Sequence, residues 1–336
     1  MVMIFLPVKG VQGEASFQDN TLIVPVVSTG NVGQLAVDLF LSSGRATTPP
    51  LVQKVGYLET DLVAPAVGYE VFGPGQPPTV CINMELHRFP GRGVTVLQQR
   101  GAVFPGEEQA FALELVTWAR ASGFKDILAL TGADAAEGLD PAPMGRGGMK
   151  RFRAGTVSGR QGGQTPTPSP CALEEALSSA GVVGFDLSGA MSGGWPMAPM
   201  EGSMLDTFPG EDSLREDFGT PAGEEDDANV EASSQGLSHL PLLPTGTGVA
   251  GHLCKEAVCG GDGGEGSLPL VVLLHFCSEG DNTPHAVQMA EAVNASLKLL
   301  PGGEGDEVSP PGAVRWTSPL SWASMYGPPP AADAYQ

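Results

Sequence analysis

The sequence predicts a three-layer α/β domain with a mixed, mostly parallel sheet, interrupted by a long disordered insert. Apolar runs of strand length alternate with helical patterns, which is typical of this class. Several of these runs are apolar on both faces, as buried parallel strands are. Sustained periodicity ends near residue 155 and returns only after residue 240, which predicts the insert.

A strand, a turn and a helix open the predicted domain. Residues 21–27 (TLIVPVV) are β-branched and apolar on both faces, which predicts a buried strand. A glycine-bearing turn, residues 28–33, follows. Residues 34–41 then place Leu35 and Leu39 on one apolar face. This order is the first part of a βαβ unit.

Four more strands are expected in the first half of the chain. Residues 51–58 predict one strand, and the buried run 126–131 (DILALT) predicts another. Between them, residues 80–87 and 94–100 partly alternate, which predicts a strand pair joined by the turn 90–93 (PGRG).

A helix is expected between that strand pair and the run 126–131. Residues 107–121 place Phe111, Leu115 and Trp118 at i, i+4 and i+7. Gly123 supplies the residue type that commonly follows the last turn of a helix.

Regular secondary structure is expected again after residue 240. Residues 269–276 (PLVVLLHF) form the most apolar strand pattern, and residues 277–282 turn the chain. Thr283 is a good N-cap, and Pro284 sits where its missing N–H does no harm, so a helix is expected to begin there.

The predicted insert spans residues 155–235 and is low in complexity and acidic. It contains consecutive Thr-Pro and Ser-Pro steps and the acidic run 224–227, and only residues 172–177 suggest a helical turn or two. Residues 1–154 and 236–336 are therefore expected to form a single domain, with residues 327–336 as a flexible C-terminal tail. A closed loop of this size adds only about 4 kcal/mol of closure entropy, which a domain tolerates.

Composition narrows the classes of function. A formal net charge of −21 disfavours nucleic acid as a partner. Five cysteines without framework spacing indicate free thiols in a reducing compartment. Neither a signal peptide nor a membrane-length apolar run is recognisable, so we expect a soluble, cytoplasmic protein without membrane contact.

Two motifs suggest a ligand and also have plainer interpretations. Residues 246–251 match G-x-G-x-x-G, yet two prolines spoil the strand that a dinucleotide site needs before it. The plainer interpretation is a glycine-rich helix start packed closely on a neighbour. His252, Cys254 and Cys259 lack the second ligand pair of a zinc finger or ribbon. No metal or cofactor is therefore expected.

Two turns carry polar residues at strand ends. Gly30, Asn31 and Gly33 open a helix and could offer N–H groups to an anion, or could simply form a tight turn. A second group, Glu279, Gly280, Asp281 and Asn282, could serve catalysis with the nearby His275 and His285, or could simply cap a helix. An enzyme acting on nucleosides or nucleotides, with phosphate at the first turn and Glu279 or Asp281 as base, is thus the alternative function.

The chain ends in Ala334, Tyr335 and Gln336, after a Gly-Pro-Pro-Pro spacer. A terminal carboxylate can pair with a lysine, and the Tyr335 ring can fill an apolar slot. These residues could therefore act as a docking plug.

Several segments together resemble the proteasome assembly chaperone 2 family. The resemblance covers roughly residues 3–153 and 240–336, and the acidic insert departs from the family pattern. The segments that carry it are residues 21–41, residues 55–68 (VGYLETDLVAPAVG), residues 272–282 (VLLHFCSEGDN), and Arg315-Trp316 with Ser321-Trp322.

The resemblance implies a fold related to nucleoside phosphorylases but without their active site. It implies a non-enzymatic chaperone that forms a heterodimer with assembly chaperone 1, in the cytoplasm and also the nucleus. This pair would bind proteasome α subunits, scaffold the α-ring of the core particle and prevent aberrant α-ring pairing. It also implies that Ala334, Tyr335 and Gln336 match a hydrophobic-Tyr-any plug that enters pockets between α subunits.

Overall fold

The structure is a computed structural model. It describes residues 3–9, 16–70, 78–137, 149–154, 171–184, 243–244, 246–259, 268–302 and 313–324. These described residues all fall in the unit formed by residues 1–185 and 243–336.

A nine-stranded mixed sheet dominates the described residues, in the order β1-β3-β6-β7-β2-β8-β11-β9-β10. The pairs β7/β2, β2/β8, β8/β11 and β9/β10 are parallel, and the other four pairs are antiparallel. Parallel pairs are therefore concentrated at the centre of the sheet and make up half of all pairs, whereas the sequence predicted a mixed sheet that is mostly parallel. The strands are β1 Ile4–Pro7, β2 Thr21–Pro25, β3 Gln53–Glu59, β6 Met84–Phe89, β7 Val94–Gln99, β8 Asp126–Asp134, β9 Met149–Ala154, β10 Val183–Gly184 and β11 Leu270–Cys277.

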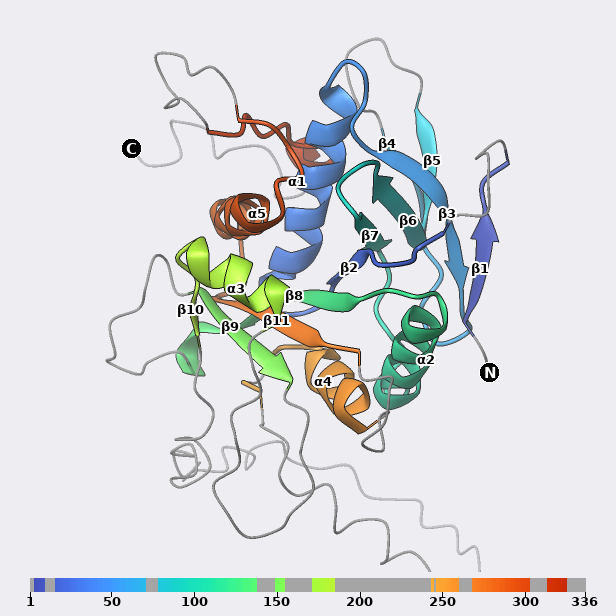
Figure 1. Ribbon diagram of the computed structural model, residues 1–336, viewed down its shortest axis with the longest axis vertical. Coiled ribbons are helices and arrows are strands. Elements are labelled where there is room, and N and C mark those ends of the chain that lie inside the picture. The colour runs from blue at the N-terminus through green and yellow to red at the C-terminus, as the bar shows by residue number, and fades with distance from the viewer. Residues whose placement is uncertain are drawn as a thin grey trace, which may run out of the picture. The chain divides into compact units, whose positions relative to one another are not determined.

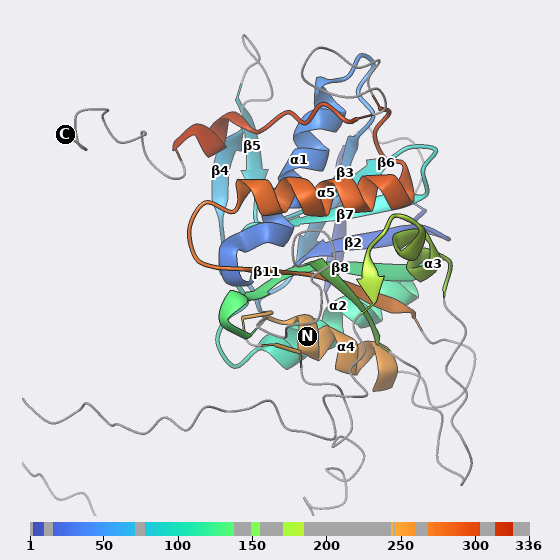
Figure 2. The same ribbon diagram turned by 90° about the vertical axis from the view of Figure 1, so that its left-hand side faces the viewer.

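Helices cover both faces of the sheet (Figures 1 and 2). On one face lie α1 Val32–Ala46, α3 Ala172–Ser179 and α5 Thr283–Leu297; on the other lie α2 Glu108–Ala121 and α4 Ala250–Cys259. The three-layer α/β class is confirmed.

The alternation of each central strand explains the two cores. In β2, Leu22 and Val24 face the helices α2 and α4, whereas Ile23 faces α1 and α5. In β11, Val272 faces α2 and α4, whereas Val271 faces α1 and α5. Since successive strand residues point to opposite faces, strands apolar at every position require two helical layers.

A separate two-stranded sheet lies beside α1 (Figures 1 and 2). It consists of β4 Val67–Glu70 and β5 Thr79–Ile82, which pair antiparallel. We call it the β4–β5 ribbon. The sequence predicted one strand over residues 80–87, but the chain instead leaves β5 at Asn83 and enters β6. The Asn83 side chain donates to the Ala64 carbonyl at 2.8 Å and thereby helps to hold this break.

Part of the predicted insert belongs to the sheet unit. Residues 171–184 form α3 and the edge strand β10, and Leu173, Leu177 and Val182 are buried in the core. The helical turn or two expected at residues 172–177 is present as α3, whereas the strand at residues 183–184 was not predicted, because it is too short to give a periodic signal. The other residues of the range 155–235, and the tail 327–336, lie outside the described residues.

A C-terminal strap, residues 313–324, crosses α1 (Figure 2). The Trp316 ring packs edge-on against Phe40 of α1 with ring centroids 5.6 Å apart, and the Thr317 N–H donates to Ser43 Oγ at 2.9 Å. The strap ends in the 3-10 helix Leu320–Ser324. It thus fixes to α1 the point from which the last residues of the chain depart.

Candidate functional site

The two polar turns predicted from the sequence lie against each other. Gly30 has a φ of 66°, and a Cβ at this position would collide with Asn282 Nδ2 and lie 2.8 Å from Cys277 Sγ. The positive φ and the close approach both require glycine here. Because the side chain of Asn282 fills the space beside Gly30, the turns form a packed contact at this point.

The first turn also packs on the sheet. Asn31 caps α1 in the left-handed region without a side-chain capping bond, and Val32 directly after it is fully buried. Gly33 presses α1 on β8, since a Cβ there would collide with the Leu130 carbonyl. The plainer interpretation of this motif as a tight turn therefore agrees with the structure.

In the second turn, the side chains are engaged mostly in local capping. Asn282 Nδ2 donates to the Ser278 carbonyl at 2.8 Å, and Asp281 Oδ1 accepts from the Thr283 N–H at 2.9 Å. Hydrogen bonds from the side chain and then the backbone N–H of Thr283 lower the pKa of the exposed Asp281 carboxyl, which disfavours it as a general base at neutral pH. Asn282, rather than Thr283, is the N-cap of α5.

The two histidines near this turn lie together but are held by amides. His275 and His285 have ring centroids 4.5 Å apart. His275 Nε2 lies 3.1 Å from Gln288 Oε1, and His285 Nδ1 lies 2.7 Å from Asn282 Oδ1. Burial lowers the pKa of His275 and favours its neutral form.

The glycine-rich motif at residues 246–251 also packs on the first turn. The Thr29 N–H donates to the Gly246 carbonyl at 2.9 Å, and a Cβ at Gly248 would collide with the Val27 carbonyl. Here the glycines admit a neighbouring backbone in place of a dinucleotide phosphate. This packing confirms the interpretation of the motif as a closely packed helix start.

Cys254, one of the three residues considered as zinc ligands, lies in an environment that disfavours metal binding. Cys254 is buried on α4, and burial raises the pKa of its thiol to about 12, which disfavours the thiolate that zinc requires. Across the part of the chain that the structure describes, no group of three or more His, Cys, Asp or Glu side chains could hold a metal ion. The docking residues Ala334, Tyr335 and Gln336 lie outside the described residues.

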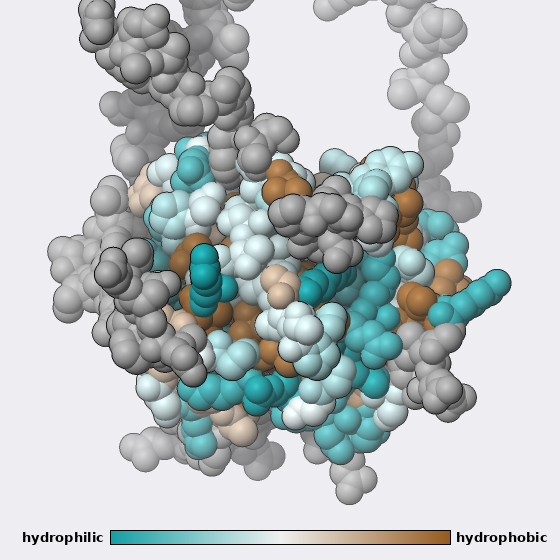
Figure 3. Space-filling view, turned by 90° about the horizontal axis from the view of Figure 1, so that it is seen from above, coloured by the Kyte–Doolittle hydropathy of each residue, from teal (hydrophilic) through white to brown (hydrophobic). Residues whose placement is uncertain are grey.

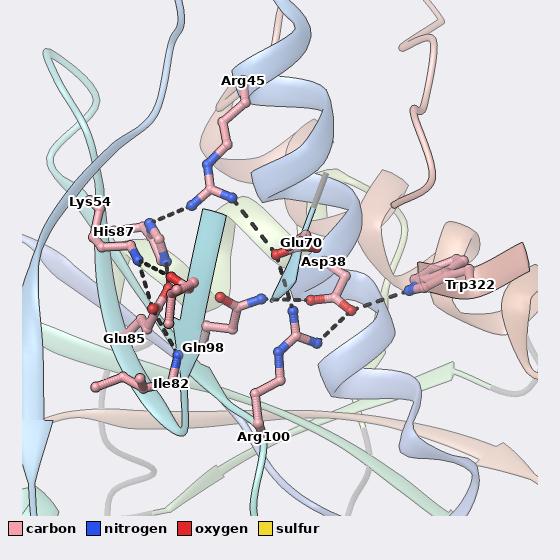
Figure 4. A network of polar contacts seen from close by, with 11 residues as sticks. Asp38, Arg45, Lys54, Glu70, Ile82, Glu85, His87, Gln98, Arg100 and Trp322 are labelled. Carbon is pink, nitrogen blue, oxygen red and sulfur yellow. Dashed lines mark hydrogen bonds and ion pairs between the residues drawn. The ribbon is translucent and has the colours of Figure 1, made fainter. Parts of the chain in front are cut away.

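A buried charged network lies between α1, the sheet and the β4–β5 ribbon (Figure 4). Its centre is Asp38 of α1, which is almost fully buried. Asp38 Oδ2 accepts from Arg100 Nη1 at 2.8 Å and from Trp322 Nε1 at 3.2 Å, while Asp38 Oδ1 accepts from Gln98 Nε2 at 2.9 Å. One carboxylate thus connects α1, the end of β7 and the C-terminal strap.

Glu70 ties the β4–β5 ribbon to this centre. Its Oε2 atom lies 3.5 Å from Arg100 Nη2 and 3.9 Å from Arg45 Nη1. Burial raises the pKa of Glu70, and the charge of Arg100 opposes that rise. Removing a cation here would leave a carboxylate uncompensated inside the protein, so the ion pairs fix β4 in place.

The network continues to β3 and β6 through a second carboxylate. Glu85 Oε1 accepts from Lys54 Nζ at 2.7 Å and from the Ile82 N–H at 3.0 Å, so it also secures β5. Its Oε2 lies 3.3 Å from His87 Nε2, and His87 Nδ1 lies 3.2 Å from Arg45 Nη2. Since Arg45 can only donate, His87 is neutral, with its proton on Nε2.

The pKa values of His87 and Glu85 are both lowered, for different reasons. Complete burial lowers the pKa of His87 to about 4, and the charge of Arg45 adds to the effect. Burial alone would raise the pKa of Glu85, but the contacts from His87 and Lys54 outweigh burial and lower it to about 2. Glu85 is therefore ionised and His87 neutral at physiological pH.

Sequence reasoning missed both the charged network and the ribbon. Asp38 and Trp322 stand 284 residues apart, and Asp38 and Arg100 stand 62 apart, so no local pattern links them. The one available signal was Asp38 within the apolar helix pattern 34–41, where a charge requires a partner. The arrangement fixes elements in place, and each of its three carboxylates is paired with a cation of the same network.

Within the described residues, no helix is both long and apolar enough to cross a lipid bilayer. A family model described as "PAC2 family" matches residues 22–257, which is well over half of the chain. This chain belongs to the PAC2 family. The resemblance to the proteasome assembly chaperone 2 family, drawn from the segments 21–41, 55–68 and 272–282, is confirmed.

Several relatives of this PAC2 family chain bear the name "Proteasome assembly chaperone 2". The protein of Xenopus laevis is 26% identical over 97% of this chain and 99% of its own length. That of Danio rerio is 27% identical over 93% of each chain, and that of Homo sapiens is 26% identical over 93% of this chain and 94% of its own.

Solved structures give more distant likenesses. Pyrococcus furiosus PbaA, described as an archaeal homolog of proteasome-assembly chaperone, has a TM-score of 0.45 and 14% identity, covering 89% of this chain and 86% of that chain. Pyrococcus furiosus PbaB, described as an archaeal proteasome activator, has a TM-score of 0.46 and 13% identity, covering 89% and 90%. These two likenesses carry no weight in the family assignment.

Proposed function

We propose that this protein is a proteasome assembly chaperone that works as one half of a heterodimer with assembly chaperone 1. The match of the PAC2 family model to residues 22–257 carries the proposal. The alignment with relatives named "Proteasome assembly chaperone 2" over nearly the full length of both chains supports it. The heterodimer binds proteasome α subunits, scaffolds the α-ring of the core particle and prevents aberrant α-ring pairing.

The role is that of a binding protein and not an enzyme. The two turns that the nucleotide-enzyme alternative would use contact each other at Gly30 and Asn282, and the glycine-rich motif packs on the same segment. Each candidate ligand-binding turn therefore has a protein contact where a ligand would bind. This packing favours a scaffold over the enzyme.

A second contact with the α-ring would come from Ala334, Tyr335 and Gln336. Ordering a short tail costs about 1–2 kcal/mol per residue, so this plug would bind weakly alone and gain from being tethered to a docked domain. Deleting these three residues should weaken binding to the α-ring and leave the heterodimer intact. Unchanged affinity for the ring would remove the plug from the account.

Capture of the tagged, full-length chain from its own cells tests the main proposal. Mass spectrometry of the captured proteins should find assembly chaperone 1 and α subunits, with few mature β subunits. Imaging of the same tagged chain should place it in the cytoplasm and the nucleus. Recovery of the chain alone, without a second chaperone or α subunits, would contradict the proposal.

A further inference from the structure

The outer face of the β4–β5 ribbon is apolar and exposed. Val67 lies opposite Ile82, and Tyr69 lies opposite Val80, so the four side chains share one face. Val67 is 76% exposed and Tyr69 is 72% exposed, although both have the residue types that normally fill a sheet core. The ribbon thus presents a compact group of β-branched and aromatic side chains to solvent.

The inner face of the same ribbon is fixed by the charged network. Glu70 points inward and is 4% exposed, with Arg100 and Arg45 as its ion-pair partners. From the other strand, the Ile82 N–H donates to Glu85, and the Val80 carbonyl accepts from Lys54 Nζ at 3.4 Å. An isolated two-stranded hairpin is marginal in water, so these bonds hold the apolar face in a preformed orientation.

The apolar surface extends beyond the ribbon. Lys54 lies between Val80 and Tyr57, with its Nζ atom 5.4 Å from the centroid of the Tyr57 ring. Tyr57 is paired in the sheet with Leu6 of the edge strand β1, which is 44% exposed. We call this surface, formed by Leu6, Tyr57, Val67, Tyr69, Val80 and Ile82, the ribbon surface.

Charge distinguishes the ribbon surface from the rest of the chain. Residues 62–84, which supply four of the six residues of the ribbon surface, contain one charged residue, Glu70, and it is turned inward. Lys54, which lies beside Val80 and Tyr57, is paired with Glu85. The chain as a whole carries a formal net charge of −21. On the face shown in Figure 3, groups of apolar side chains reach the surface among polar ones. Interface centres are depleted of charge and enriched in aromatic residues, as the ribbon surface is.

We propose that the ribbon surface is the docking site for assembly chaperone 1, which contributes an apolar, uncharged patch of its own. This assignment rests on the proposed function. A second copy of this chain is disfavoured as the occupant, because two chains of charge −21 repel each other. Tyr69 is the central anchor, and the charged network keeps it oriented before the partner arrives.

The test uses the full chain co-expressed with assembly chaperone 1. Val67→Glu with Tyr69→Glu places two charges on the ribbon surface at exposed positions, so folding should be retained. The matched control is Leu113→Glu, which is 52% exposed on α2, on the other side of the sheet. We expect the double variant to bind the partner at least about 30-fold more weakly and the control to bind as the wild type does.

Hydrogen exchange of the wild-type complex gives a measurement that needs no variant. Amides of residues 67–70 and 79–82 should exchange more slowly once the partner is bound. A folded double variant with wild-type affinity, or no change in that exchange, would overturn the assignment while leaving the heterodimer in place. If the double variant lost α subunits but retained assembly chaperone 1, the surface would instead bind α subunits. If the wild type self-associated and the variant did not, the surface would instead bind a second copy of this chain. A wild type that never binds the partner would sink the proposed function itself.

Discussion

Asp38 is the residue on which the charged network is centred, and it is buried in the apolar helix α1. It has three hydrogen-bond donors, from Gln98, Arg100 and Trp322. A buried carboxylate is tolerated only with such partners, because desolvation of an unpaired charge costs several kcal/mol. The network therefore makes the position of β7, the ribbon and the strap depend on a few side chains.

Replacing Arg100 tests this dependence. Arg100→Ala would leave Asp38 and Glu70 without their shared cation, so we expect a loss of about 3–5 kcal/mol in the free energy of unfolding. Urea denaturation measures it. Arg92→Ala, on the exposed turn 90–93, is the control and should change stability by less than about 0.5 kcal/mol. Equal effects of the two variants would show that the ion pairs contribute little.

His87 predicts a pH dependence. Its pKa is about 4 in the folded chain and 6.5 ordinarily, so the unfolded chain binds the extra proton between these values. The contribution of His87 to the free energy of unfolding is therefore complete above pH 6.5. It falls as pH drops towards 4, by roughly 2 kcal/mol between pH 7 and pH 5. Glu85, with its pKa of about 2, loses its contribution as pH falls from its ordinary value towards 2, mostly below this window.

The variant His87→Gln isolates the contribution of that imidazole. Glutamine stays neutral, so the difference in unfolding free energy between pH 7 and pH 5 should be smaller in this variant by roughly 2 kcal/mol. Denaturant titrations at the two pH values supply the comparison. An undiminished pH dependence in the variant would mean that other groups cause it.

At the scale of elements, the C-terminal strap depends on its two tryptophans. Trp322→Ala removes a buried ring and the bond to Asp38, so we expect a loss of about 3 kcal/mol and faster hydrogen exchange in residues 313–324. Leu320→Ala, in the same 3-10 helix but exposed, should leave that exchange unchanged. Unaltered exchange in Trp322→Ala would show that the strap is held elsewhere.

Sequence periodicity was sufficient to predict those buried helices and strands whose apolar residues form a continuous pattern. Residues 21–27, 107–121 and 126–131 were predicted from such patterns and correspond closely to β2, α2 and β8. The ribbon was missed because residues 62–79 are rich in proline and glycine and because its apolar residues face solvent. Its strands are positioned by long-range ion pairs, which cannot be detected from the periodicity of a local sequence.

The turns show the other limit of prediction. The position of Gly30 and Asn282 at strand ends could be predicted, and so could the capping role of the second turn. Their mutual contact could not, because it depends on which strands are neighbours in the sheet. The order β2-β8-β11 brings the two turns to the same edge, and that order is a property of the whole fold.

For the whole molecule, the part of the chain between the two flanks should be largely dispensable for folding. Replacing residues 186–242 with a short Gly/Ser linker should change the free energy of unfolding by less than about 1 kcal/mol, since loop closure depends weakly on length. Calorimetry of the two proteins measures this.

A longer deletion, of residues 155–235, serves as the contrast. It also removes α3 and β10 with three buried apolar side chains, so it should cost about 5 kcal/mol. Equal stability of the two deletions would contradict the placement of α3 in the core.

The most direct test of the central claim is the state of the α-ring in cells depleted of this chain. Native gels probed for α subunits should show fewer complete core particles and more aberrantly paired α-rings, and the full-length chain should restore the normal pattern. Core particles that form at the normal rate, without aberrant rings, would contradict the account of this protein as an assembly chaperone.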